Sequence, residues 1–112
     1  MLTTVVSKPS DSEAVVDGGL KAFSTDKPFT PDAVRLWKNG PKPFSGAVFT
    51  WGGDEHGKLN LAKASAPLSV GDRVECIIPH CDPSVNLYDR IYAVRGQQVA
   101  AVWPITARGM SQ

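Results

Sequence analysis

The stretch Arg73-Val74-Glu75-Cys76-Ile77-Ile78-Pro79 carries the strongest β-strand pattern of the chain. Successive side chains of a strand point to opposite faces of the sheet. Val74, Cys76 and Ile78 therefore share one apolar face, whereas the other face is more polar. The pattern predicts a strand over residues 73–79 with one face in the core.

Short apolar runs separated by glycine and proline occupy the rest of the chain. We expect further strands at residues 2–7, 14–17, 46–51, 58–63, 87–94 and 98–105. A turn at Arg95-Gly96-Gln97 would join the last two into a hairpin, and residues 20–24 would continue the second strand after a bulge at Gly18-Gly19. Short strands at this spacing predict a mainly β domain, a small barrel or sandwich with at most one or two short helices.

Residues 25–45 form a different kind of segment, because prolines interrupt them repeatedly. Thr30 could cap a short helix over residues 30–37, since Pro31 suits a first helical position. A long excursion loop is the equal alternative, and loops of that length often line functional sites or interfaces.

The size and composition suit a single domain spanning residues 1–112. Apolar residues make up 42% of the chain, and the net charge is +1 with scattered basic residues, which argues against a nucleic-acid partner. No apolar run approaches the ~20 residues that cross a membrane. Residues 1–10 lack the basic start and apolar centre of a signal peptide, so we expect a cytoplasmic protein.

The two cysteines, Cys76 and Cys81, are expected to be reduced. On an extended segment they would lie about 16 Å apart, which is too far for a disulfide. Free thiols agree with an intracellular location.

His80 and Asp82 stand two residues apart, directly after the predicted strand. In an extended segment their side chains would point to the same side, about 6.5 Å apart, and could reach one cation, while Cys81 would point away. Two protein ligands leave coordination positions open, as catalytic metal sites require. On spacing alone, a surface His–Asp pair at a strand end is the competing interpretation.

Six segments occur in the order found in one known family. They are Val15-Val16-Asp17-Gly18-Gly19-Leu20-Lys21-Ala22, Gly53-Asp54-Glu55-His56-Gly57, Val70-Gly71-Asp72-Arg73-Val74, Pro79-His80-Cys81-Asp82-Pro83, Asn86-Leu87-Tyr88-Asp89 and Val102-Trp103-Pro104-Ile105. With them the chain resembles the C-terminal domain of D-threonine aldolases and related D-serine dehydratase-like proteins, which are alanine-racemase-like pyridoxal-phosphate enzymes. The similarity covers nearly the whole chain except the proline-rich stretch.

The resemblance implies a larger enzyme. Its N-terminal (β/α)8 barrel binds pyridoxal phosphate through a lysine, and its C-terminal β-domain helps to close the active site, usually within a homodimer. The β-domain supplies a His-x-Asp metal pair in the aldolases and a His-x-Cys pair in the dehydratases. Here His80 and Asp82 match the aldolase pattern, and an oxygen ligand shifts the metal preference from zinc toward manganese or magnesium. Glu55, His56 or Asp89 could orient these ligands from behind.

A chain of 112 residues cannot contain the barrel, which needs about 250 residues. We therefore expect an isolated domain or fragment that is inactive alone and has no catalytic or cofactor-binding residue of its own. Its expected partners are the barrel domain, a second subunit and a small D-amino acid, and a severed domain would tend to self-associate. The reaction implied for the intact enzyme is retro-aldol cleavage of D-3-hydroxy-2-amino acids to glycine and an aldehyde.

Three other functions remain open from the sequence. A D-serine dehydratase or amino-acid racemase relative would use the same scaffold. A metal-free β module would only mediate association. A stand-alone metallohydrolase is the weakest alternative, because two ligands hold a catalytic ion poorly.

Overall fold

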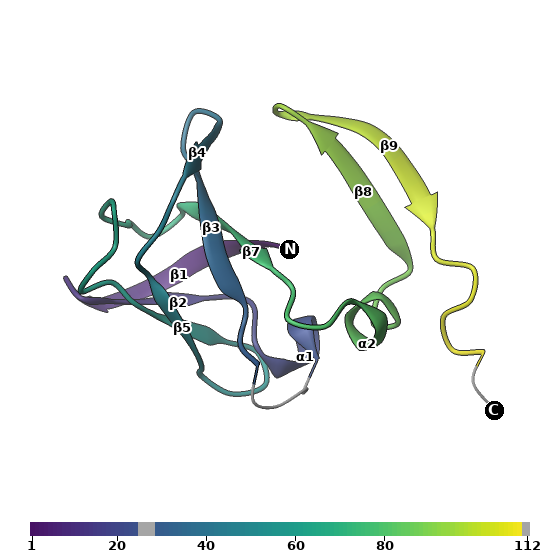
Figure 1. Cartoon of the computed structure of the whole chain (residues 1–112), viewed down its shortest axis with the longest axis horizontal. Helices are drawn as coiled ribbons and strands as arrows, with labels where there is room; N and C mark the ends of the chain where they lie inside the picture. The colour runs from purple at the N-terminus through teal and green to yellow at the C-terminus, as the bar shows by residue number, and fades with distance from the viewer. Residues whose placement is uncertain (25–28, 111–112) are drawn as a thin grey trace.

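The computed structural model describes residues 1–24 and 29–110. Within them the chain is mainly β with two short helices, which confirms the predicted fold class (Figure 1). The elements are β1 (Leu2–Ser10), β2 (Glu13–Val16), α1 (Leu20–Phe23), β3 (Asp32–Trp37), β4 (Pro41–Pro43), β5 (Val48–Trp51), β6 (Gly57–Asn60), β7 (Arg73–Ile77), α2 (Cys81–Val85), β8 (Arg90–Arg95) and β9 (Gln98–Pro104). In the described part of the chain, no helix has the length and apolar character that a membrane crossing requires.

Seven strands form one antiparallel sheet in the order β4-β3-β7-β1-β2-β6-β5. The long strand β1 joins its two halves, because residues 2–4 pair with β7 whereas β2 pairs along the remainder from Val5 onward. Residues of β3 and β5, from opposite halves of the sheet, also come into contact. The sheet therefore curls around its core, but it does not close into a barrel.

The core lies inside this curl and is built by alternating side chains of the strands. Val74 and Cys76 of β7 are almost fully buried, as the alternation of the sequence predicted. Phe23 of α1 packs edge-on against Phe49, with ring centroids 5.7 Å apart, and Phe49 packs against Trp51 at 5.3 Å. Such edge-to-face pairs add about 0.5–1.5 kcal/mol each beyond the burial of apolar area, and they tie α1 to the sheet.

The prediction for residues 30–37 was wrong in both of its forms, because β3 occupies residues 32–37. This strand pairs with β7 on one side and with β4 on the other. A bulge between Ala33 and Arg35 inserts one extra residue. Ala33 and Leu36 are consequently both buried although they are three positions apart, and this spacing hides the two-residue period of a strand. Residues 25–28 of the proline-rich segment lie outside the described residues.

The expectation that residues 20–24 continue β2 was also wrong, because α1 begins at Leu20. The backbone N–H groups of Leu20 and Lys21 donate to the carbonyl oxygens of Gly53 and Asp54, at 3.2 and 3.0 Å. These bonds satisfy donors that the first turn of a helix leaves without partners. A Cβ at Gly19 would overlap the backbone of Asp54, so the loop can approach α1 only because glycine stands there.

Strand β4 was not predicted, and the two prolines in its three residues explain why. Proline has no N–H to give to a ladder and is confined to edge strands. Here β4 is the outermost strand of the sheet and, within residues 1–24 and 29–110, pairs with β3 alone. The predicted strands at 46–51, 58–63, 73–79 and 87–94 exist as β5, β6, β7 and β8 with shifted ends.

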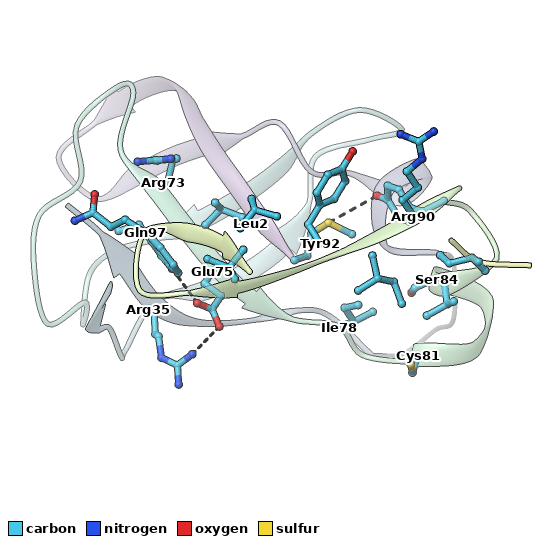
Figure 2. A pocket seen from close by; sticks show the side chains of 18 residues that line it. Leu2, Arg35, Arg73, Glu75, Ile78, Cys81, Ser84, Arg90, Tyr92 and Gln97 are labelled. Carbon is cyan, nitrogen blue, oxygen red and sulfur yellow. Dashed lines mark hydrogen bonds and ion pairs between the residues drawn. The ribbon is translucent and has the colours of Figure 1, made fainter. Parts of the chain in front are cut away.

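The hairpin of β8 and β9 is confirmed, and it forms a separate two-stranded sheet. It stands beside the main sheet, and α2 links it to β7 (Figure 1). Between the hairpin and the strands β1, β3 and β7 lies a largely apolar cavity of about 860 Å³ (Figure 2). At one end Glu75 accepts a hydrogen bond from Trp37 Nε1 and pairs with Arg35, each at 2.8 Å.

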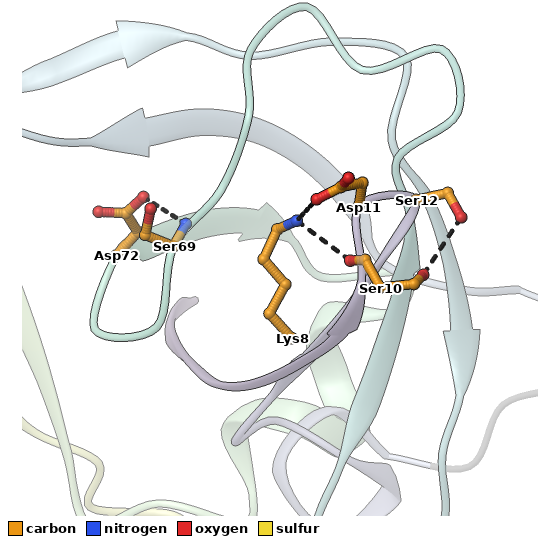
Figure 3. A network of polar contacts seen from close by, with 6 residues as sticks. All are labelled: Lys8, Ser10, Asp11, Ser12, Ser69 and Asp72. Atoms are coloured by element: carbon orange, nitrogen blue, oxygen red, sulfur yellow. Dashed lines mark hydrogen bonds and ion pairs between the residues drawn. The ribbon is translucent and has the colours of Figure 1, made fainter.

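The turn between β1 and β2 is held by polar contacts at the surface (Figure 3). Lys8 Nζ donates to the carbonyl oxygen of Ser10 at 3.0 Å and pairs with Asp11 at 3.4 Å. The hydroxyls of Ser10 and Ser12 lie 3.3 Å apart. Exposed ion pairs contribute little to the free energy of folding, so these contacts add little to the stability of the hairpin.

Candidate functional site

The predicted metal pair lies at the junction of β7 and α2 and not on an extended strand. Strand β7 ends at Ile77 and helix α2 begins at Cys81, which corrects the strand expected over residues 73–79 and its extension to Asp82. His80 is the residue before the helix, with φ −143° and ψ 117°. Asp82 and Pro83 follow in the first turn, where a carboxylate favours the helix dipole and a missing N–H is tolerated. An acidic residue followed by proline is typical of a helix start, and the predicted strand did not take this pattern into account.

The two side chains converge despite this change of backbone. Nε2 of His80 lies 3.8 Å from Oδ2 of Asp82, and the side chains are 48% and 91% exposed. Metal bonds of about 2.0–2.2 Å to each donor can span that separation. Imidazole nitrogen and carboxylate oxygen are both donor types that divalent cations accept in proteins.

The pair is not accompanied by a third ligand of the usual types. Within residues 1–24 and 29–110, no group of three or more His, Cys, Asp and Glu side chains is placed to hold an ion. Any further ligands would have to be water, a substrate or groups from another part of the protein. The donor chemistry therefore fits a divalent cation, in a site that is open to solvent.

Two hydroxyls, one in α2 and one just after it, attach this segment to the end of α1. The Ser84 side chain is 1% exposed, and its Oγ lies 2.5 Å from the carbonyl oxygen of Phe23 and 2.7 Å from that of His80. The hydroxyl of Tyr88 donates to the carbonyl oxygen of Ala22 at 2.8 Å, and burial raises the pKa of this phenol. Carbonyls at a helix end have no partner within the helix. These two hydroxyls therefore give partners to carbonyls at the end of α1, and the Ser84 hydroxyl also contacts the backbone of His80.

The acidic loop over residues 53–56 is an exposed turn docked on α1. Glu55 Oε1 lies 2.5 Å from Lys21 Nζ. The hydrogen bond and charge of this pair raise the pKa of Lys21 and lower the pKa of Glu55. Glu55, which we expected could orient the metal ligands, is thus engaged by Lys21.

The carboxylate of Asp89 is likewise engaged by another side chain, since it pairs with Arg108 Nε at 2.5 Å. His56 remains exposed on the acidic loop. The side chain that contacts the backbone of His80 is instead that of Ser84, and Tyr88 contacts the carbonyl oxygen of Ala22; beyond the polar character of these residues, nothing in the sequence indicated either contact. Cys81 is exposed and Cys76 buried, both as free thiols, so the expected absence of a bridge is confirmed. Cys81 contributes to the wall of the large cavity (Figure 2).

Comparisons with known proteins place this arrangement in one family. A family model described as "Putative serine dehydratase domain" matches residues 1–94. The chain is 36% identical to 3-hydroxy-D-aspartate aldolase of Paracoccus denitrificans, over 97% of its own length and 25% of that protein. It is 33% identical to D-threonine aldolase of an Arthrobacter species, over 100% of its length and 27% of that protein.

A solved structure agrees with these relatives. The crystal structure of D-threonine aldolase from Filomicrobium marinum superposes with a TM-score of 0.79 and 32% identity, over 97% of this chain and 28% of that one. The chain thus spans about a quarter of the relatives it matches. The resemblance read from the six segments is confirmed, and the chain belongs to the family described as the serine dehydratase domain.

Proposed function

We propose that this chain is the metal-bearing β-domain of a pyridoxal-phosphate-dependent lyase of the D-threonine aldolase type. The intact enzyme would cleave D-3-hydroxy-2-amino acids to glycine and an aldehyde. The observation that carries the proposal is the approach of His80 Nε2 and Asp82 Oδ2 to 3.8 Å at an exposed helix start. The identities of 33–36% to two aldolases support it.

A divalent cation held by His80 and Asp82 would stabilise negative charge on the β-hydroxyl oxygen of the substrate. Pyridoxal phosphate, bound by a barrel domain outside this chain, would take up the electrons released from the Cα–Cβ bond. In this scheme Ser84 and Tyr88 hold the metal loop in place. The chain alone would bind the metal but would not catalyse the reaction.

The partners we propose are the barrel domain and a second subunit, in the cytoplasm. The β8–β9 hairpin is the surface best suited to them, because Tyr92, Val99 and Trp103 are 55–59% exposed. An isolated two-stranded hairpin is marginally stable in water, and packing against another domain would remove these side chains from solvent.

Metal titration tests the proposal directly. We expect isothermal titration calorimetry to detect Mn²⁺ binding to the chain. His80→Ala and Asp82→Ala should each weaken this binding at least ~10-fold, which corresponds to a loss of about 1.4 kcal/mol in binding free energy. Cys81→Ser is the matched control, since it alters the residue between the ligands and should leave the affinity unchanged. Equal Mn²⁺ binding by all four proteins would show that the ion sits elsewhere, and no binding by any of them would remove the metal from the proposal.

A dehydratase is the second candidate, because the description of the matching family names a serine dehydratase. The two can be separated by adding a separately expressed barrel domain and supplying D-threonine or D-serine. Aldehyde release from D-threonine supports the aldolase, whereas deamination of D-serine without aldol cleavage would replace it with the dehydratase.

A further inference from the structure

The function proposed above assigns no occupant to the large cavity between the β8–β9 hairpin and the main sheet. Its volume is about 860 Å³. Val74 and Cys76 of β7 point into the core. Arg73 and Glu75 alternate with them, so they lie on the outer face of the sheet, and both line the cavity. The cavity therefore separates the outer face of the main sheet from the hairpin (Figure 2).

A backbone edge of the hairpin borders this cavity. Arg90, Ile91 and Tyr92 are consecutive in β8 and point to alternate faces of the hairpin, yet all three line the cavity. Strand β9 lies on the far side of β8 (Figure 1). Within the described residues β8 pairs with β9 alone, so alternate residues of β8 direct their N–H and C=O groups away from β9. Such an edge is a template for a further strand.

Apolar side chains face the cavity from both sides and are still partly exposed to solvent. Leu2 of β1 is 46% exposed, and Ile91 and Val94 of β8 are 42% and 52% exposed. The hairpin and the main sheet therefore do not cover each other's apolar side chains. An occupant with apolar side chains would remove them from water, which is favourable.

The charged side chains around the cavity are mainly basic. Arg35, Arg73 and Arg90 line it, and Glu75 is the one acidic residue among the described residues of the wall. Glu75 is already engaged by Arg35 and by Trp37 Nε1, each at 2.8 Å. Arg73 and Arg90 have no carboxylate partner in the part of the chain that the structure describes, and they lie toward opposite ends of the cavity (Figure 2). The wall therefore suits an occupant with carboxylates.

A second copy of the chain does not fit this wall. Its exposed hairpin carries Arg90 and Arg95 and no acidic residue over residues 90–104. Like charges brought together across an interface oppose binding. The chain covers 25% and 27% of the two aldolases named above, so most of the polypeptide of such an enzyme lies outside it and can supply the occupant.

We infer that the cavity receives an extended segment of the barrel domain, which carries apolar and acidic side chains and adds to β8 as a further strand. The inference rests on the proposed function, which supplies the barrel domain as a partner. Main-chain hydrogen bonds to the free edge of β8 give affinity, as in other cases of strand addition. Carboxylates of the segment pair with Arg73 and Arg90, and its apolar side chains cover Leu2 and Ile91.

Titration of the ¹⁵N-labelled chain with synthetic peptides, followed by NMR, tests the inference. The acidic probe is an octapeptide that alternates valine and aspartate, with both ends blocked, and the basic probe has lysine in place of each aspartate. At millimolar concentration the acidic probe should shift the amide signals of Leu2 and of residues 90–95. It should also slow the hydrogen exchange of alternate amides in β8. The basic probe should bind at least ~10-fold more weakly.

A double variant tests the role of the two arginines. Arg73→Gln with Arg90→Gln removes both charges that lack a carboxylate partner and should weaken binding of the acidic probe at least ~10-fold. Lys58→Gln with Lys63→Gln is the matched control, because it removes two exposed basic residues that do not line the cavity. It should leave the affinity unchanged. Circular dichroism of both double variants should match that of the unmodified chain.

The separately expressed barrel domain connects the peptide to the natural occupant. It should shift the same β8 amides, and the acidic probe should compete with it for the chain. A barrel domain that binds without slowing hydrogen exchange in β8 would show that no segment of it adds to this strand, which would overturn the inference.

Four results with the peptides would also overturn it: no shifts in β8, an equal response to the basic probe, an undiminished response in the arginine double variant, or shifts without slowed exchange. Shifts in β8 that grow with the concentration of the chain alone would assign the cavity to a second copy instead. The metal-bearing role is read separately, from shifts at His80 and Asp82 on addition of Mg²⁺. Metal shifts without peptide shifts refute only the cavity assignment, and peptide shifts without metal shifts refute only the metal-bearing role.

Discussion

Ser84 offers the sharpest test of how the site is built. Its buried hydroxyl lies within 2.7 Å of two carbonyl oxygens, one at the end of α1 and one on His80. Ser84→Ala removes the only proton that these contacts can share and leaves the carbonyl of Phe23 without this donor. A lost hydrogen bond that leaves a buried polar group unsatisfied costs about 1–3 kcal/mol.

The expected result is a fall in the free energy of unfolding of about 2 kcal/mol, seen in thermal or urea unfolding followed by circular dichroism. For a domain of this size that corresponds to a drop in Tm of roughly 5–10 °C. The Mn²⁺ affinity should also fall, by up to about tenfold, because groups that position metal ligands contribute on that scale.

Ser12→Ala is the matched control. Ser12 lies in the exposed turn between β1 and β2, and among the described residues its hydroxyl contacts that of Ser10 alone (Figure 3). Its loss should change stability by less than about 0.5 kcal/mol. The reasoning fails if Ser84→Ala melts within error of Ser12→Ala, since the hydroxyl would then not connect the two helices.

Two further predictions concern the core and the acidic loop. Burial raises the pKa of the Cys76 thiol from 9.0 to about 11. The folded state therefore holds this proton after the unfolded chain has released it, so this contribution is complete below pH 9 and is lost as the pH rises to about 11. The free energy of unfolding should therefore fall by about 2–3 kcal/mol across this pH range. Urea unfolding at a series of pH values should show a smaller fall in Cys76→Ala. An equal fall in the variant and the unmodified chain would contradict the burial. Gly19→Ala should destabilise the chain by at least about 2 kcal/mol, because a Cβ would overlap the backbone of Asp54; Gly71→Ala, at an open position with φ 91°, measures the cost of conformation alone. Gly19 itself has φ −109°, which alanine adopts without strain, so a loss below about 0.5 kcal/mol in Gly19→Ala would rule out close approach as the reason for this glycine.

The parts of the fold that the sequence predicted are those with a simple period. β7 has Val74 and Cys76 on one buried face, and the hairpin of β8 and β9 has a glycine turn between two apolar runs. Strand β3 was missed because its bulge places buried residues three apart, and β4 because its prolines are tolerated only at the sheet edge. Both depend on pairing between distant segments, which a local pattern does not contain.

The candidate site divides in the same way. The spacing of His80 and Asp82 indicated a shared ligand pair, but the backbone enters a helix at Cys81, between the two residues. The Asp-Pro-Ser sequence is compatible with a helix start but does not require one. The attachment of α2 and the residues after it to α1, through Ser84 and Tyr88, joins residues more than sixty positions apart. Glu55 and Asp89 were plausible supports from their chemistry alone, yet each is paired with a basic side chain elsewhere.

Anomalous diffraction at the manganese edge, from crystals of the chain soaked in Mn²⁺, is the most direct test of the metal site. The account predicts one strong peak about 2.2 Å from both His80 Nε2 and an Asp82 carboxylate oxygen, with water in the remaining positions. A peak at other residues, or none beside this pair in crystals where the site faces solvent, would contradict it.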